Sequence, residues 1–350
     1  MLQEMFDKID ADADLTKDEI SYLLTLEKED ELEQLYQRAD QVRKRYVGEE
    51  VHLRGLIELS NYCRKNCLYC GIRRDNRAIP RYRMDVEEVL ETVALAEGLG
   101  YRTVVLQSGE DLHYTADILV SMVRQVKQQS DVAVTLSIGE RPRHVYEKLF
   151  EAGADRYLMR FETSNPDLYK RLHPDSRYEE RMAILTWLKE MGYQVGSGVM
   201  VGVPGQTFDD LAQDILTFKE MDLDMVGVGP YICHEATPLA GSPNGTVEMT
   251  LKVVALTRIV TRDTNIPATT ALATLRPLDG REKALQVGAN VVMPNVTPVK
   301  YRALYELYPD KICIGDAAEQ CQGCITGRIM SIGRPISQDY GHSFKRNTAK

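Results

Sequence analysis

The sequence predicts an α/β fold, a full (βα)8 barrel preceded by a helical cap, and three patterns lead to this prediction. Eight short apolar segments recur along the chain, and segments with helical spacing separate them. Continuous apolar strands that alternate with helices are typical of a parallel sheet. No composition shift or low-complexity linker interrupts the repeats. Eight repeated units suit a TIM-type barrel, so we expect residues 1–350 to form a single domain.

The elements follow in order from the N-terminus. Residues 1–49 are expected to form a helical extension, because Thr16 and Glu19 have capping-box spacing and a second helix carries apolar residues at helical spacing. The barrel is expected over 51–300, with helices at 178–191, after Asp85 and after Thr207. Residues 301–350 form a C-terminal segment with a second cysteine motif. The eight strands are expected at 51–58, 103–107, 132–136, 156–161, 195–201, 224–230, 267–271 and 290–294.

Composition narrows the function classes. The formal net charge is −9, which gives no support to nucleic-acid binding. No run of 18 apolar residues predicts a membrane span, and the first residues lack the pattern of a signal peptide. A cytoplasmic location is therefore expected, with no membrane partner. Seven cysteines in a reducing compartment favour metal binding over disulfides.

The main site motif is Cys63-Arg-Lys-Asn-Cys67-Leu-Tyr69-Cys70, directly after the first expected strand. Its C-x₃-C-x₂-C spacing supplies three thiolates, enough for three irons of a [4Fe–4S] cluster with the fourth iron open. An open iron can chelate S-adenosylmethionine (SAM), and electron transfer to the sulfonium then releases a 5′-deoxyadenosyl radical. Zinc is the competing interpretation, but a zinc site normally has a fourth Cys or His at a typical spacing, and none follows here.

Residues at the carboxyl ends of barrel strands are the next candidates, because functional groups gather at that end of such barrels. Glu110 can accept from an ammonium group, Glu162 from ribose hydroxyls, and Arg181 can pair with a carboxylate. Glu162 and Arg181 can instead be ordinary surface charges. The full set expected to bind SAM is Tyr69, Gln107, Ser108, Gly109, Glu110, Glu162, Arg181, Pro230, Tyr231 and Ile232.

A second cysteine motif lies near the C-terminus. Cys313, Cys321 and Cys324 have C-x₇-C-x₂-C spacing, which can hold a second iron–sulfur cluster. Because the motif follows the last expected strand, we expect it to be accessory. The six histidines show no metal-binding spacing, and the isolated Cys233 is expected to be a buried thiol.

With these residues placed, the chain resembles radical SAM enzymes, and in particular the HydE family of [FeFe]-hydrogenase maturases, from about residue 15 to about 335. That family is related to biotin synthase and methylornithine synthase. In many relatives a histidine stands where this chain has Phe161, which puts the fine detail of the substrate pocket in doubt. The motifs that carry the resemblance are YCRKNCLYCGIRRDN at 62–76, RYRM at 81–84, VLQSGED at 105–111, GADRY at 153–157, ETSNP at 162–166, VGVPGQT at 201–207, IPATTA at 266–271 and GAN at 288–290.

The resemblance implies a (βα)8 barrel with a [4Fe–4S] cluster and SAM as cofactors, and a C-terminal cluster site that is variable and not needed for maturation. It also implies an organometallic substrate, an iron bearing carbon monoxide, cyanide and cysteine, with HydG, HydF and an electron donor as partners. Such a complex is anionic and calls for positive or hydrogen-bonding groups. By position, these are Arg54, Arg160, Thr269, Thr270, Tyr305 and Tyr308.

Two other functions remain open from the sequence. The chain can be a radical SAM mutase or sulfur-inserting enzyme that acts on a small amino acid, like methylornithine synthase or biotin synthase. It can also be a non-catalytic iron–sulfur carrier.

Overall fold

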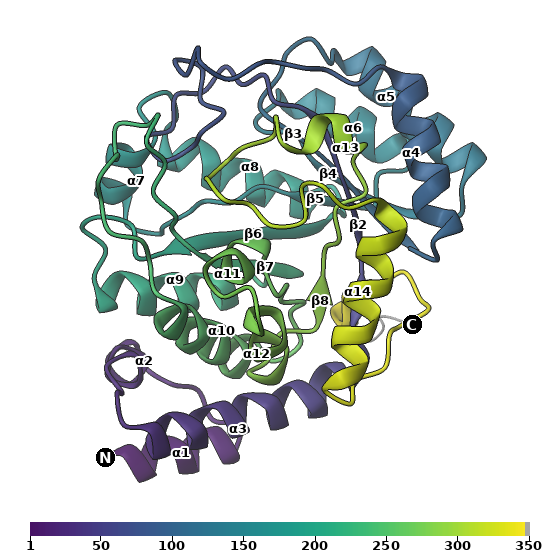
Figure 1. The fold of residues 1–350 in the computed structure, drawn as a ribbon. Coiled ribbons are helices and arrows are strands. Elements are labelled where there is room, and N and C mark those ends of the chain that lie inside the picture. The colour runs from purple at the N-terminus through teal and green to yellow at the C-terminus, as the bar shows by residue number, and fades with distance from the viewer. Residues whose placement is uncertain (347–350) are drawn as a thin grey trace.

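Six parallel strands form the main sheet of the computed structural model, which describes residues 1–346 (Figure 1). Their order in the sheet, β2 to β7, is their order along the chain, and β1 pairs with β8 in a separate two-stranded sheet. The strands are β1 (His52–Leu53), β2 (Gly55–Ser60), β3 (Thr103–Ser108), β4 (Ala133–Ser137), β5 (Arg156–Leu158), β6 (Gln194–Val201), β7 (Met225–Pro230) and β8 (Val291–Val292). The α/β class and the parallel sheet are therefore confirmed.

Helices alternate with these strands and surround the sheet (Figure 1). Capping boxes open the helices that follow Thr16, Asp85 and Thr207, which confirms the predicted box at Thr16 and the predicted helix starts after Asp85 and Thr207. The helices are α1 (Leu2–Asp10), α2 (Lys17–Leu24), α3 (Glu29–Val47), α4 (Val86–Gly98), α5 (Ala116–Gln129), α6 (Arg143–Glu151), α7 (Pro166–Leu172), α8 (Tyr178–Glu190), α9 (Phe208–Glu220), α10 (Val247–Thr261), α11 (Thr270–Leu275), α12 (Gly280–Gln286), α13 (Val299–Arg302) and α14 (Ala318–Ser331), with a final 3₁₀ turn η1 (Phe344–Arg346).

The strand prediction is wrong in one place. Residues 267–271 are not a strand: only Pro267 makes a parallel bridge, to Val291, and α11 begins at Thr270. The hydroxyl of Thr269 accepts from the backbone N–H of Leu272, so this threonine caps a helix. The β-branched residues that suggested a strand are here a cap and the first turn of a helix. The first expected strand is also divided, into β1 and β2 at Arg54.

The N-terminal extension is helical, as predicted. Its second helix, α2, packs against α9, and α3 packs against α10. The buried ammonium group of Lys252 on α10 donates to the carbonyl oxygens of Leu24 (2.6 Å) and Leu26 (2.9 Å). These bonds give hydrogen-bond donors to carbonyl groups at and just after the end of α2, and they fix the extension to the outer helices of the sheet.

The C-terminal tail crosses the amino-terminal ends of the strands. The carbonyl oxygen of Tyr340 accepts from Thr103 on β3 (2.7 Å) and from Arg156 on β5 (2.6 Å). The tail therefore covers one end of the sheet and leaves the carboxyl ends of the strands for a site. Within the described residues, no helix is long and apolar enough to cross a membrane.

Candidate active site

A cavity of about 320 Å³ lies at the carboxyl ends of the strands. It is lined by the three cysteines of the first motif and by residues that follow β3, β5 and β7. All ten residues expected to bind SAM line this cavity, namely Tyr69, Gln107, Ser108, Gly109, Glu110, Glu162, Arg181, Pro230, Tyr231 and Ile232. The structure thus brings together residues from five separate parts of the sequence.

The loop that carries the three cysteines is shaped by hydrogen bonds to its own backbone. The guanidinium of Arg81 donates to the carbonyl oxygens of Ile72, Arg73 and Asn76, each at 2.8 Å. The amide of Asn76 donates to the carbonyl of Gly71 at 2.6 Å. Because side chains within the loop satisfy its carbonyls, the loop holds its shape through the chain's own contacts.

The end of β3 packs directly against this loop. A Cβ at Gly109 would lie 2.2 Å from the carbonyl oxygen of Tyr62, so only glycine permits this approach. The close contact lets the N–H of Glu110 donate to Cys63 Sγ at 3.3 Å. Hydrogen bonds to sulfur are one means by which a protein tunes an iron–sulfur cluster.

The donor set of the cavity fits a [4Fe–4S] cluster with one open iron. Burial raises the pKa of Cys67 to about 12 and also raises the pKa of the Cys63 thiol, so these thiols need a bound metal to become thiolates. Among the described residues, His173 is the one imidazole on the cavity wall, and both its nitrogens are engaged. Its Nδ1 donates to Tyr169 O (3.0 Å), so its Nε2 accepts from the Tyr69 hydroxyl (2.9 Å). No fourth thiol and no free imidazole is left on the described wall.

Burial lowers the pKa of His173 to about 3, so its ring is neutral. A neutral ring that orients Tyr69 is a structural element that the sequence did not predict, because the histidine lies far from the cysteine loop along the chain. The edge of one ring meets the face of the other, with centroids 5.4 Å apart.

Charged side chains form a network beside the cysteines. Glu140 accepts from Arg181 at 2.8 and 3.0 Å and pairs with Lys65 at 2.6 Å. Glu110 pairs with Arg64 at 2.5 Å and accepts from the N–H of Glu140 at 2.9 Å. Arg181 also donates to the carbonyl of Arg160, so much of its guanidinium is engaged by the protein. The sequence analysis did not single out Glu140, which follows β4, or Lys65, which lies between Cys63 and Cys67 in the cysteine motif.

Glu162 has an unusual backbone and an unsatisfied carboxylate. Its φ of 64° lies in the left-handed region, a strain that typically costs about 1–3 kcal/mol and occurs mostly at functional sites. Its Oε2 lies 3.0 Å from Arg160 in an ion pair, but no hydrogen bond reaches this oxygen. Burial raises the pKa of Glu162, against the effect of Arg160 and Arg181. An orphaned acceptor on the cavity wall fits a ligand that offers hydroxyl groups.

Asp214 on α9 supports the turn after Glu162. Its Oδ1 accepts from the N–H of Ser164 (2.5 Å) and from the Ser164 hydroxyl (2.6 Å), and its Oδ2 has no partner. Burial raises the pKa of Asp214 to about 7. The raised value means that the folded protein binds this proton more tightly than the unfolded chain does.

Asp214→Asn should therefore remove a pH dependence of stability. For a carboxyl with a raised folded pKa, stability is lost as pH rises from the unfolded pKa to the folded pKa. Between about pH 5 and about pH 7 the wild-type free energy of unfolding should fall by up to about 3 kcal/mol relative to the variant. Urea unfolding at several pH values measures this difference. Parallel pH profiles for the two proteins would contradict the assignment.

Of the six residues expected to meet the substrate, Arg160, Thr269, Tyr305 and Tyr308 line the cavity. The hydroxyl of Tyr305 accepts from Gln107 at 3.2 Å. A buried ion pair between Lys311 and Glu58 fixes the segment that carries both tyrosines over the end of β2.

Arg54 and Thr270 do not reach this cavity. Arg54 precedes β2 and lies at the opposite end of the sheet, where it donates to the carbonyl of Gly341 at 3.0 Å. Thr270 begins α11 and lines a smaller cavity beside the C-terminal cysteines. The prediction for these two residues is therefore not supported.

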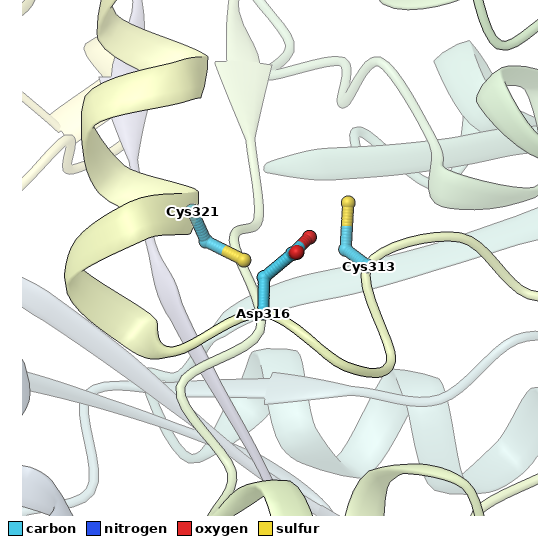
Figure 2. A group of neighbouring side chains, drawn as sticks. All are labelled: Cys313, Asp316 and Cys321. Atoms are coloured by element: carbon cyan, nitrogen blue, oxygen red, sulfur yellow. The ribbon is translucent and has the colours of Figure 1, made fainter.

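The C-terminal cysteines meet around an acidic residue. The ligand atoms of Cys313, Asp316 and Cys321 all lie within 4.8 Å of one another (Figure 2). A hydrogen bond with Cys321 lowers the pKa of Cys313 to about 6. Cys324 lines the same cavity of about 40 Å³, but its side chain is exposed. The sequence missed Asp316, which is not part of the cysteine spacing.

Replacing Cys313, Cys321 and Cys324 together by serine should leave SAM cleavage within about twofold of wild type. The two cavities share no lining residue, so the second motif does not contribute a wall to the first. Iron content should fall while deoxyadenosine production persists. Loss of SAM cleavage in a folded triple variant would show instead that the two sites are coupled.

Comparison with known proteins agrees with this geometry. The family model of the Radical SAM superfamily matches residues 57–218. That superfamily uses a [4Fe–4S] cluster and SAM, for which the three thiols fit. The chain is 32% identical to a 3-methylornithine synthase of Methanosarcina acetivorans over 83% of this chain and 82% of that protein. The crystal structure of methylornithine synthase (PylB) aligns with a TM-score of 0.83 at 28% identity, over 95% of this chain and 97% of that one.

A higher identity links the chain to a hydrogenase maturase. It is 51% identical to the [FeFe] hydrogenase maturase subunit HydE of Thermotoga maritima over 339 residues, which cover 97% of each protein. With three cysteines at the mouth of a parallel α/β fold and this identity along nearly its whole length, the chain is a radical SAM enzyme and belongs to the HydE family of [FeFe] hydrogenase maturases.

Proposed function

We propose that this enzyme cleaves SAM reductively and directs the resulting radical at the cysteine sulfur of an anionic iron complex that bears carbon monoxide and cyanide. The observation that carries the proposal is the composition of one cavity. Three thiols lie on one part of its wall, and Arg160, Thr269 and two tyrosines line the rest. Radical chemistry and substrate binding thus occur in the same enclosed space.

Cys63, Cys67 and Cys70 would hold the [4Fe–4S] cluster. When bound, this cluster supplies the electron that cleaves SAM. The chain's own contribution is to orient the loop through Arg81 and to donate from the N–H of Glu110 to Cys63.

The cavity wall then orients SAM. Glu162 would accept from the ribose hydroxyls, since its Oε2 lacks a hydrogen-bond donor. Arg181 would pair with the carboxylate of SAM, Glu110 and residues 107–109 would receive its ammonium group, and the apolar turn at 230–232 would contact its adenine. Tyr69, held by His173, completes the wall beside the cysteines.

The substrate would lie beyond SAM. Arg160 carries positive charge at the cavity, and its Nε has no hydrogen-bond partner in the described structure. An unpartnered guanidinium nitrogen and the hydroxyls of Thr269, Tyr305 and Tyr308 can donate to cyanide or carboxylate groups of an anionic complex.

We also infer that the two sheets are parts of one closed barrel within a single domain. Isolated parallel bridges link Met225 of β7 to Asn265, Pro267 to Val291 of β8, and Leu56 of β2 to Asn295. These bridges support a continuous ring of eight segments. A cytoplasmic location, with HydG and HydF as partners and a separate electron donor, follows from the proposed reaction.

The test is maturation of an apo-hydrogenase in a lysate that contains HydG and HydF. Hydrogen evolution should depend on this chain and should be lost with Cys63→Ala. SAM cleavage without any activation would show that the substrate assignment is wrong.

An amino-acid mutase is the second candidate, favoured by the similarity to methylornithine synthase. Incubation with a panel of small amino acids, SAM and reductant, followed by mass spectrometry of the amino acids, separates the two. An isomerised amino acid would favour the mutase.

A further inference from the structure

The loop that carries the three cysteines has a charge opposite to that of the chain. Residues 62–83 contain seven arginine or lysine residues and one acidic residue, whereas the whole chain has a formal net charge of −9. Of the seven, only Lys65 lines the cavity. The proposed binding of SAM and substrate therefore does not explain why the other six are present.

The carboxylates that pair with these arginines lie beneath them. Arg64 pairs with Glu110 at 2.5 Å, and Arg83 pairs with Asp111 at 2.7 Å. The two carboxylate side chains are 4% and 3% exposed, whereas the two arginines are 48% and 35% exposed. Because the negative partners are buried and the guanidinium groups are not, the surface presents positive charge to solvent.

Two more arginines of the loop extend this surface. The guanidinium of Arg74 donates to the carbonyl of Arg64 at 3.2 Å, so Arg74 lies against Arg64. Its ion-pair partners, Asp75 and Asp175, are both 3.3 Å away. Arg77, three residues further along the loop, is exposed and forms no ion pair with a described residue. The charge of Arg77 is therefore free to meet a partner.

Apolar side chains lie among these charges. Tyr62 and Leu112 are 37% and 55% exposed, although both are large and hydrophobic. The guanidinium of Arg83 lies over the Tyr62 ring, 3.8 Å from its centroid, and Leu112 follows Asp111, the partner of Arg83. Exposed aromatic side chains beside arginines are typical of protein interfaces. We call the following residues the basic face: Tyr62, Arg64, Arg74, Arg77, Arg83 and Leu112.

The basic face adjoins the proposed cluster. Tyr62 and Arg64 flank Cys63 in the chain. Cys63 lines the cavity, whereas no residue of the basic face does. Reductive cleavage of SAM consumes one electron each time, and the rate of electron transfer falls steeply with distance. A donor on the basic face would lie close to Cys63 without entering the cavity where SAM and substrate bind.

We propose that the basic face is the docking surface for a small acidic electron-carrier protein, which reduces the cluster by one electron. The carrier loses this electron and the cluster gains it, and no bond forms or breaks in the step. Because the chain as a whole is acidic, an acidic carrier is attracted here and disfavoured over the rest of the surface. Electron-transfer interfaces are small and transient, which suits a face of this size. The inference rests on the proposed function, since it needs a cluster in the cysteine loop.

The first test compares two reductants in SAM cleavage by the cluster-loaded, full-length protein under anaerobic conditions. One is purified flavodoxin, an acidic flavin carrier, reduced beforehand and used below its KM. The other is dithionite at saturating concentration, which needs no docking surface. With flavodoxin, we expect deoxyadenosine production to fall at least about tenfold between about 0.01 M and about 0.15 M ionic strength, because the Debye length shortens from about 30 to about 8 Å.

The two reductants separate this inference from the proposed function. An equal salt response with dithionite, or no salt response with flavodoxin, would overturn the docking proposal. No SAM cleavage with dithionite would instead show that the proposed function is wrong, and the binding measurement below then decides about the surface.

A double charge reversal localises the effect. Arg74→Glu combined with Arg77→Glu should lower the flavodoxin-dependent rate at least about tenfold and leave the dithionite-dependent rate within about twofold of wild type. Replacing both residues by lysine should keep the wild-type rate, because lysine retains the charge. Arg124→Glu combined with Lys283→Glu is the matched control, since both side chains are exposed, lie outside residues 62–83 and form no ion pair with a described residue. An equal loss in this control would overturn the proposal.

Calorimetry with oxidised flavodoxin measures docking without SAM or electron transfer. We expect the dissociation constant to rise at least about tenfold in the double charge reversal and to stay unchanged in the control. A face that receives another maturase instead would give a different pattern, with full flavodoxin binding in the charge-reversed variant but no activation of the hydrogenase. That pattern would overturn the proposal.

Discussion

Replacing Cys67 by alanine is expected to lower the rate of reductive SAM cleavage by more than about 100-fold. This loss exceeds the 10–100-fold that typically follows when a residue hydrogen-bonded to a metal ligand is removed. The reason is the small number of side chains on the cavity wall that can bind the cluster. Three thiols line the cavity, and the one imidazole on its described wall is engaged by Tyr69 and Tyr169, so the described wall offers no further thiol or free imidazole in place of a missing thiolate. Iron content, the EPR signal on addition of SAM, and deoxyadenosine production measure the effect.

Cys233→Ala is the matched control. Its thiol lies close to the site in sequence and space but lines no part of the cavity, and Sγ donates to the carbonyl of Leu239 at 3.3 Å. This variant should keep the cluster and wild-type cleavage. Full iron content and cleavage in Cys67→Ala would exclude the cysteine loop as the cluster site.

The sequence predicted most of the fold because the strands are continuous apolar runs and the helices begin with strong capping residues. Helix α8, at Tyr178–Glu190, differs from the expected 178–191 by a single residue. The seventh expected strand failed because Thr269 and Thr270 are β-branched yet serve as the cap and first residue of α11. Local propensity is overridden here by a side-chain hydrogen bond to the backbone.

The site was predictable where one rule applied, that functional groups follow strands of a parallel sheet. The rule found Gln107, Glu110 and Glu162, which all line the cavity. Arg54 was named for its positive charge inside the first expected strand, and it does not reach the cavity, because it precedes β2 and lies at the opposite end of the sheet. The same rule could have indicated Glu140, which follows β4, but only the three-dimensional structure shows that this carboxylate lies between Arg181 and Lys65.

Glu162→Gln is expected to weaken SAM binding about 10- to 100-fold. The carboxylate has one oxygen without a hydrogen-bond donor, and a hydrogen bond to a charged group contributes about 1.5–3 kcal/mol. Glutamine keeps the shape of the side chain but places an NH₂ group where one carboxylate oxygen was. In the position of Oε2, that group would meet the guanidinium of Arg160, 3.0 Å away, as a second donor, and it could not accept from a ribose hydroxyl.

Anaerobic calorimetry of the cluster-loaded protein with SAM measures the dissociation constant. Glu282→Gln is the matched control, because this partly buried carboxylate pairs with Arg328 outside the cavity and should leave the affinity unchanged. The cluster should form normally in both variants, since neither residue touches a cysteine thiol. An unchanged dissociation constant in Glu162→Gln would mean that the strained turn at Glu162 serves the fold, held by Asp214, and that ribose is bound elsewhere in the cavity.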